Sequence, residues 1–131
     1  MLSQGSAEGQ ENHIVQQSSK LNENLKSKYT IVSQVSITDL CITFNIDHID
    51  YLKMNIEGSE VRAIYGLTDS KLFPRYVCIC YHYFLCTDEM TTYNKVDEWL
   101  YENNYKIKEM NLDSLRPSEL YTIFAERYNE L

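Results

Sequence analysis

Residues 49–60 read IDYLKMNIEGSE and constrain the fold more than any other stretch of the chain. The first part has the apolar, aromatic and β-branched residues of a strand, with Leu52, Met54 and Ile56 on one side. The second part runs through Gly58 into carboxylates, which favour the start of a helix. A strand that turns this directly into a helix is typical of open α/β sheets, which bind ligands outside the carboxyl ends of their strands.

The composition is that of one small, acidic globular domain. The chain has 131 residues, of which 44% are hydrophobic, and its net charge is −7. Three lysines balance three glutamates in residues 1–28, so the negative excess lies on residues 29–131. An acidic chain without a Lys/Arg cluster disfavours binding to nucleic acid and to anionic membranes. No apolar run approaches the ~20 residues of a membrane span, and no signal-peptide pattern is present. We therefore expect a cytoplasmic protein whose four cysteines are free thiols.

The pattern divides the chain into two predicted parts. Residues 1–28 are polar and read as a flexible N-terminal segment with a short helical turn around 20–26. Residues 29–131 predict an α/β fold with parallel strands, crossover helices and a final antiparallel strand pair. The predicted order is a strand at 29–32, a helix at 36–44, a strand at 50–56, a helix at 59–65, a strand at 76–84, a helix from Thr91 or Thr92 to Asn103, and strands at 105–110 and 120–127.

Several boundaries follow from specific residues. Ser36 with Asp39 predicts a capping box at the first helix, and Gly66 predicts the end of the second. The run 76–84 is apolar without a period, which favours a central strand covered on both faces. The turn containing Arg116-Pro117-Ser118 separates the final two strands.

Residues 49–60 resemble the motif around the fourth strand of FkbM-type methyltransferases, which reads close to I-D-x-L-K-[IM]-D-[VI]-E-G-[AS]-E. Ten of the twelve residues fit this pattern, and the resemblance extends loosely over 29–131. It implies the C-terminal part of a Rossmann-like methyltransferase sheet, with S-adenosylmethionine (SAM) as cofactor. The glycine-rich turn of that fold's first strand has no counterpart, since Gly5 and Gly9 follow no β-branched strand. The chain is therefore expected to begin within or just after the third strand.

The resemblance also implies a set of site residues. Asn55, Glu57 and Glu60 take the positions that lie beside the methyl acceptor and cofactor. Asn55 replaces an aspartate, and an amide can orient an acceptor but cannot act as a base near neutral pH. His82 is then the best remaining base candidate, since an imidazole titrates near pH ~6.5. Two plainer interpretations stay open: the glutamates only favour a helix start, and the histidine is only a hydrogen-bonded residue at a strand end.

The implied activity is methyl transfer from SAM to a hydroxyl acceptor such as a sugar. Whether the chain catalyses this alone is left open, because the cofactor-binding half has no counterpart in it. The alternative is a non-catalytic remnant that acts as a protein-interaction module. In that interpretation the open edge of strand 50–56 pairs with a second copy or another chain, or residues 1–28 cover it.

The cysteines predict neither a metal site nor a nucleophile. Cys78, Cys80 and His82 share one strand face, with Cys86 nearby. Extended residues i and i+2 lie ~6.6 Å apart, so a straight strand cannot bring them to one zinc ion at ~2.0–2.3 Å. Cys41 lies on an apolar helix face, and no basic neighbour is predicted beside any thiol. We expect all four cysteines to be structural.

Overall fold

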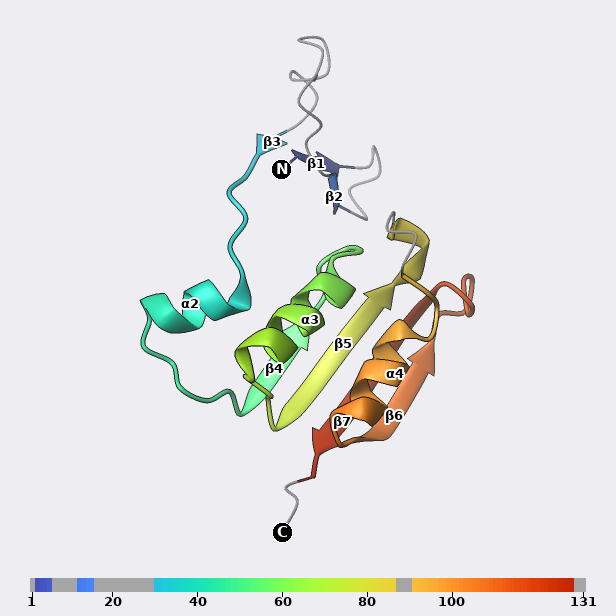
Figure 1. The fold of residues 1–131 in the computed structure, drawn as a ribbon. Coiled ribbons are helices and arrows are strands. Elements are labelled where there is room, and N and C mark those ends of the chain that lie inside the picture. The colour runs from blue at the N-terminus through green and yellow to red at the C-terminus, as the bar shows by residue number, and fades with distance from the viewer. Residues whose placement is uncertain (1, 6–11, 16–29, 87–90, 129–131) are drawn as a thin grey trace. The chain divides into compact units, whose positions relative to one another are not determined.

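The computed structural model describes residues 2–5, 12–15, 30–86 and 91–128 (Figure 1). The chain forms two compact units, Met1–Val35 and Ser36–Leu131. The division falls just before the first helix that the capping residues predict.

The N-terminal unit contains a three-stranded antiparallel sheet. β1 (Leu2–Gly5) lies between β2 (Asn12–Val15) and β3 (Thr30–Ile31). The strand predicted at 29–32 is therefore present as β3, but its expected place in the parallel sheet is wrong. β1 offers hydrogen-bonding groups on both edges, and β3 pairs with it through Leu2↔Ile31. The helical turn predicted at 20–26 lies outside the described residues.

The second unit is an α/β domain built on a mixed four-stranded sheet of order β4-β5-β7-β6. Its strands are β4 (Tyr51–Met54), β5 (Tyr76–His82), β6 (Tyr105–Leu112) and β7 (Leu120–Arg127). β4 and β5 are parallel, whereas β7 runs antiparallel to both of its neighbours. The predicted α/β class and the final antiparallel pair are confirmed. Within the described residues the sheet is open, with β4 and β6 at its edges.

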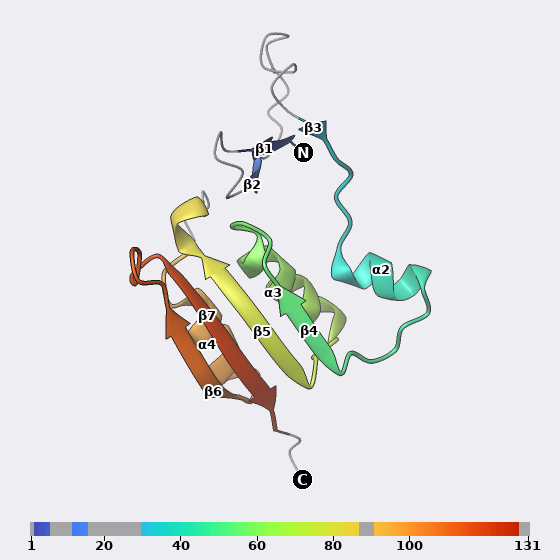
Figure 2. The ribbon, with the colours of Figure 1, turned by 180° about the vertical axis from the view of Figure 1, so that it is seen from behind.

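Helices α3 (Glu60–Ser70) and α4 (Lys95–Glu102) pack on one face of this sheet, as the opposite views in Figures 1 and 2 show. The expectation that β5 is covered on both faces is wrong. Burial alternates along the strand: Val77, Ile79 and Tyr81 are buried, whereas Cys78 and Cys80 are partly exposed. Because both helices pack on the same face, every second side chain of β5 points away from them.

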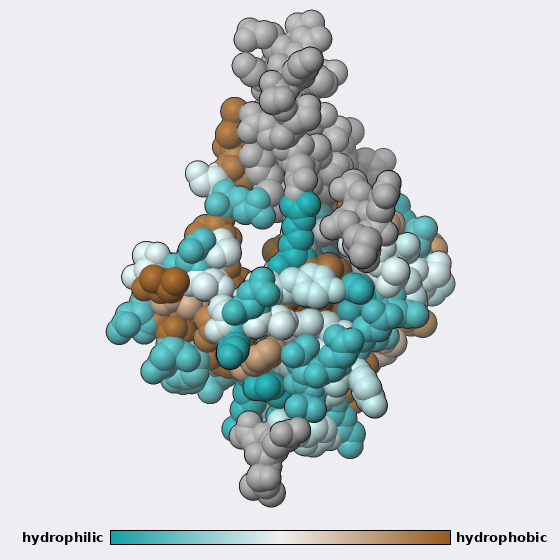
Figure 3. Space-filling view, viewed as in Figure 1, coloured by the Kyte–Doolittle hydropathy of each residue, from teal (hydrophilic) through white to brown (hydrophobic). Residues whose placement is uncertain are grey.

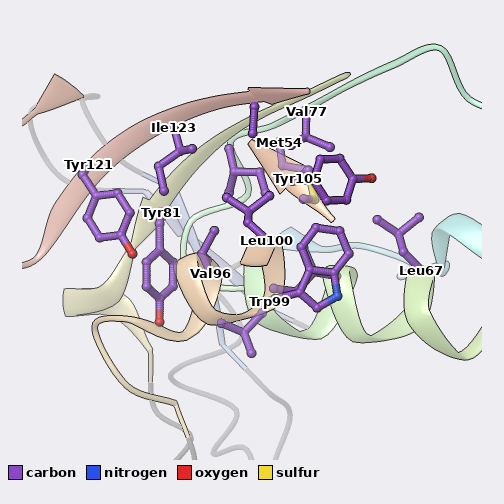
Figure 4. Close-up of a cluster of buried hydrophobic side chains, with 14 residues drawn as sticks. Met54, Leu67, Val77, Tyr81, Val96, Trp99, Leu100, Tyr105, Tyr121 and Ile123 are labelled. Carbon is purple, nitrogen blue, oxygen red and sulfur yellow. The ribbon is translucent and has the colours of Figure 1, made fainter. Parts of the chain in front are cut away.

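The core lies between these two helices and the sheet (Figure 4). It is made of branched aliphatic side chains and rings that are almost completely removed from water. Its largest fully buried members are Tyr81, Tyr121, Ile64, Leu67, Ile79, Leu100, Ile123, Val77 and Val96, and the nearly buried Trp99 packs with them. At about 25 cal/mol per Å² of apolar surface removed from water, this cluster is the main favourable contribution to folding.

Buried tyrosines keep their hydroxyl groups bonded to the backbone. The Tyr81 hydroxyl donates to the carbonyl of Thr92 at 2.8 Å, and the Tyr121 hydroxyl donates to the carbonyl of Tyr93 at 2.7 Å. A buried hydroxyl without such a partner would cost about 1–3 kcal/mol. These bonds also fix the segment that leads into α4 against β5 and β7.

Helix α2 (Ile37–Thr43) begins as the capping residues predict. The Ser36 hydroxyl accepts the backbone N–H of Asp39 at 3.0 Å and donates to its carboxylate at 2.8 Å. The predicted apolar face is only partly covered: Cys41 is buried, whereas Leu40 and Phe44 remain 40% and 68% exposed. Figure 3 accordingly shows hydrophobic side chains gathered over α2.

The expectation that Gly66 ends the next helix is wrong. α3 continues to Ser70, and Lys71 takes the left-handed conformation at its end with φ 55°. The apolar positions Val61, Ile64 and Leu67 are all buried on one side, so core packing extends through the glycine.

Gly58, which lies just before α3, and Gly66, which lies within it, provide a matched stability test. Gly58 has φ +97°, and an added Cβ would lie 3.0 Å from the backbone oxygen of Leu85. Gly58→Ala should therefore lower the free energy of unfolding by about 1–3 kcal/mol. An added Cβ at Gly66 meets nothing within 4 Å. Gly66→Ala should raise the free energy of unfolding by up to about 1 kcal/mol, because alanine is the better helix former.

Urea denaturation followed by circular dichroism measures both changes. Destabilisation of similar size in the two variants would contradict the helical position of Gly66. A neutral effect of Gly58→Ala would contradict the left-handed turn.

Candidate functional site

The site forms where β4 ends and α3 begins. After Met54 the chain passes through Asn55 and Ile56 into a turn in which Glu57 and Gly58 both have positive φ, 53° and 97°. Glycine adopts this conformation without strain, whereas a glutamate at positive φ is uncommon and requires support from its surroundings. Leu85, which follows β5, lies against Gly58 and leaves no room for a side chain there.

The Glu60 carboxylate provides that support. It is fully buried and accepts the backbone N–H groups of Ile56 at 3.1 Å and of Gly58 at 3.1 Å. Its Oε1 atom also lies 3.0 Å from Nδ1 of His82. Because a buried charge is tolerated only when it is paired and hydrogen-bonded, these contacts explain how a glutamate occupies this position. They also join the end of β4 to the end of β5.

His82 lies between two carboxylates. Its Nδ1 faces Glu60, and its Nε2 lies 3.5 Å from Oε2 of Glu57. The side chains of His82 and Glu60 are 6% and 0% exposed, whereas that of Glu57 is 21% exposed. Glu57 is therefore the carboxylate of this group that a bound molecule can reach.

The surroundings of His82 favour its charged form. Burial opposes protonation of the imidazole, but the contacts with Cys80 and Glu60 outweigh it and raise the pKa of His82 to about 10. The ring is then an imidazolium near neutral pH and donates from both nitrogens. In this arrangement it is a cation that contacts the Glu60 carboxylate at 3.0 Å and lies 3.5 Å from the Glu57 carboxylate.

The cysteines near His82 belong to the same cluster. Nε2 of His82 lies 3.9 Å from Sγ of Cys80, and this contact lowers the pKa of the Cys80 thiol more than burial raises it. Sγ of Cys86 contacts the carbonyl oxygen of His82 at 3.4 Å. The expectation that no thiol has a basic neighbour is therefore wrong for Cys80. The signal was present in the sequence, because residues 80 and 82 share a strand face.

The four predicted site residues separate into different environments. Glu57, Glu60 and His82 come together although they lie on different elements, whereas Asn55 is exposed just beyond β4 and makes none of these contacts. Among the described residues no group of three or more His, Cys, Asp or Glu side chains is arranged to hold a metal ion.

Charged side chains therefore lie at the carboxyl ends of the adjacent parallel strands β4 and β5, the edge at which open α/β sheets bind ligands. The comparison with protein families identifies the class of protein: the model of the Methyltransferase FkbM domain matches residues 3–107. The chain belongs to this family, which confirms the resemblance of residues 49–60. Neither the comparison with curated proteins nor that with solved structures found a match.

Family membership places the chain among methyltransferase-family proteins. The family implies SAM as methyl donor in general and suggests a small-molecule acceptor. The match begins at residue 3 and so includes the N-terminal segment. In the described part of the chain, every helix is too short or too polar to cross a membrane.

The raised pKa of His82 predicts a specific dependence of stability on pH. The folded state binds the imidazole proton more tightly than the unfolded chain, whose histidine titrates near 6.5. This stabilisation is complete below pH 6.5 and is lost as the pH rises to about 10. The difference in unfolding free energy between the parent and His82→Gln should therefore shrink over this window, by at most about 1.4 kcal/mol per pH unit.

Urea denaturation at a series of pH values tests this expectation. His48→Gln is the matched control, because His48 is also paired with carboxylates, Asp47 and Asp50, but is 74% exposed. Its effect should be small and should disappear in high salt. A difference between parent and His82→Gln that is constant with pH would contradict the charged state of His82.

Proposed function

We propose that this chain acts in SAM-dependent methylation of a hydroxyl group on a small molecule such as a sugar. The observation that carries the proposal is the reachable Glu57 carboxylate, held 3.5 Å from His82 where the parallel strands β4 and β5 end. Ligands of open α/β sheets bind at this edge. Membership in the FkbM family supplies the reaction class.

The sheet topology supports the proposal that the four-stranded sheet corresponds to the C-terminal part of the family's fold. Two parallel strands followed by an antiparallel β7 and an outer β6 agree with the C-terminal part of a Rossmann-like methyltransferase sheet. Of the residues 29–131 predicted for that part, we assign Ser36–Leu131 to it, because β3 pairs within the N-terminal unit. Residues 1–28 remain assigned to a polar N-terminal segment.

Each side chain has a separate role in the proposed reaction. Glu57 accepts a hydrogen bond from the acceptor hydroxyl and takes its proton as the new bond to oxygen forms. His82 in its charged form orients Glu57, and Glu60 holds His82 and the turn in place. Asn55, exposed beyond β4, orients the acceptor through its amide. The base role considered for His82 thus passes to Glu57, because an imidazolium has no lone pair to accept a proton.

The described residues fit the acceptor side of such a site. SAM, when bound, supplies a methyl group on a sulfonium sulfur, and a nearby carboxylate suits that positive charge. In the described part of the N-terminal unit the strands are antiparallel, and no strand–glycine turn–helix of the type that holds nucleotide cofactors is present. We therefore assign no residue to the binding of SAM.

Removal of the Glu57 charge tests the assigned roles. Glu57→Gln should lower the rate of methyl transfer by about 10²–10⁴, because the amide hydrogen-bonds but does not take a proton. Binding of SAM, measured by calorimetry, should change little. Transfer of a radiolabelled methyl group from SAM to a panel of sugars measures the rate.

Glu102→Gln is the matched control, since Glu102 is an exposed carboxylate at the end of α4. It should leave the rate unchanged. No heat on titration with millimolar SAM would overturn the proposal that this chain is an autonomous enzyme. Full activity of Glu57→Gln would overturn the assigned base.

A second candidate function has its own observation. β4 is an edge strand within the described residues and pairs there with β5 alone. An unpaired strand edge exposes backbone N–H and C=O groups that recruit another strand. A non-catalytic interaction module, pairing through β4 with a second copy or another chain, is therefore the alternative that we propose.

Sedimentation velocity over a wide concentration range distinguishes the alternative. Edge pairing between copies predicts a sedimentation coefficient that rises with concentration as dimers form. A concentration-independent monomer would contradict self-association through β4, whereas methyl transfer by that monomer would favour the enzyme.

A further inference from the structure

A chain of contacts connects a partly exposed thiol to a buried carboxylate. Sγ of Cys80 lies 3.9 Å from Nε2 of His82, and Nδ1 of the same ring lies 3.0 Å from Oε1 of Glu60. A thiol beside an imidazole that is oriented by a third group is the arrangement of an activated nucleophile. Neither the family match nor the proposed methyl transfer gives Cys80 a role.

The position of Cys80 makes the thiol accessible. Side chains of β5 that face α3 and α4 are buried, whereas Cys80 points to the other face and is only partly buried. Thr122, its register partner on β7, contributes a hydrogen bond that also lowers the pKa of this thiol. Exposure together with a lowered pKa distinguishes reactive cysteines from structural ones.

The charges around Cys80 come from three elements. His82 lies on the same strand, Glu60 begins α3, and Glu57 lies in the turn after β4. The imidazolium favours the thiolate, and the negative charge of Glu60 opposes it. The contact with His82 is the larger effect, so the thiolate is favoured on balance.

We propose that Cys80 is a covalent modification site for small, soft electrophiles. The thiolate sulfur attacks an electrophilic carbon, a sulfur–carbon bond forms, and the leaving group departs with its bonding electron pair. The proton stays on His82, whose charge Glu60 stabilises. The product is a neutral thioether beside the imidazolium.

Cys78 is a second thiol on β5 that lies outside the contacts between Cys80, His82 and Glu60. It lies two residues earlier on the same face and is likewise partly exposed. On β4 its register partner is Lys53, and the phenol of Tyr51, whose pKa is raised by burial, contacts its thiol, so that Cys78 has a lysine and a phenol where Cys80 has the imidazole of His82. Cys78 is therefore a matched internal control for Cys80.

Modification of Cys80 also has a consequence for methyl transfer, and this part rests on the proposed function. An adduct on Sγ occupies space beside the ring that orients Glu57. Alkylated protein should therefore lose methyl transfer while remaining folded. The reactivity of the thiol itself does not depend on that outcome and is measured separately.

Competitive alkylation of the full chain with limiting iodoacetamide tests the proposal. Cleavage after Arg75 and Lys95 yields one peptide that contains both Cys78 and Cys80, so fragment ions give their relative rates within one molecule. At pH 7 Cys80 should react on the order of tenfold faster, since an ordinary thiol is only a few per cent ionised there. The ratio of the two rates should fall toward unity as the pH rises into the range in which ordinary thiols ionise.

Variants test whether the reactivity of Cys80 comes from its contact with His82 or only from its exposure to solvent. Cys80→Ser should abolish the fast reaction, and Cys78→Ser should leave it intact. His82→Gln should reduce the rate of Cys80 to that of Cys78, with folding checked by circular dichroism. In urea the two parent thiols should react equally. If His82→Gln does not fold, the pH profiles of the parent decide the matter: coincident profiles for Cys78 and Cys80 would overturn the proposal.

Discussion

The buried carboxylate of Glu60 is the constraint on which the rest of the site depends. Its hydrogen bonds from the backbone of Ile56 and Gly58 fix the turn after β4, and its pair with His82 fixes that turn against β5. A fully buried carboxylate without these partners would cost several kcal/mol. The same bonds hold the left-handed conformation of Glu57. The position of the partly exposed Glu57 carboxylate therefore depends on the buried Glu60 carboxylate.

Local sequence signals predicted the helices, strands and turns better than they predicted how these elements pack together. The Ser36 cap and the turn at Arg116 depend on short-range hydrogen bonds, and both are present as expected. Gly66 failed as a stop signal because the burial of Leu67 outweighs the propensity of one residue. The apolar run of β5 suggested two covered faces, but pattern alone does not reveal on which face the helices pack.

The sequence predicted candidate site residues but not the contacts between them. The motif at 55–60 identified Glu57 and Glu60, and elimination identified His82. That His82 lies between both carboxylates depends on the register of β4 against β5 and on a turn held by tertiary contacts. The raised pKa of His82 follows from that geometry, because a pKa is set by neighbours that sequence spacing does not reveal.

Because one imidazole contacts two carboxylates and a thiol, the charge states of these groups are coupled. A proton on His82 places a positive charge 3.5 Å from Glu57, the carboxylate proposed to bind the hydroxyl acceptor, and at the same time favours the thiolate of Cys80. Loss of that proton would weaken both effects together. The same buried pair thus supports the proposed acceptor chemistry and the reactivity of Cys80, and a change in Glu60 is expected to alter both through His82.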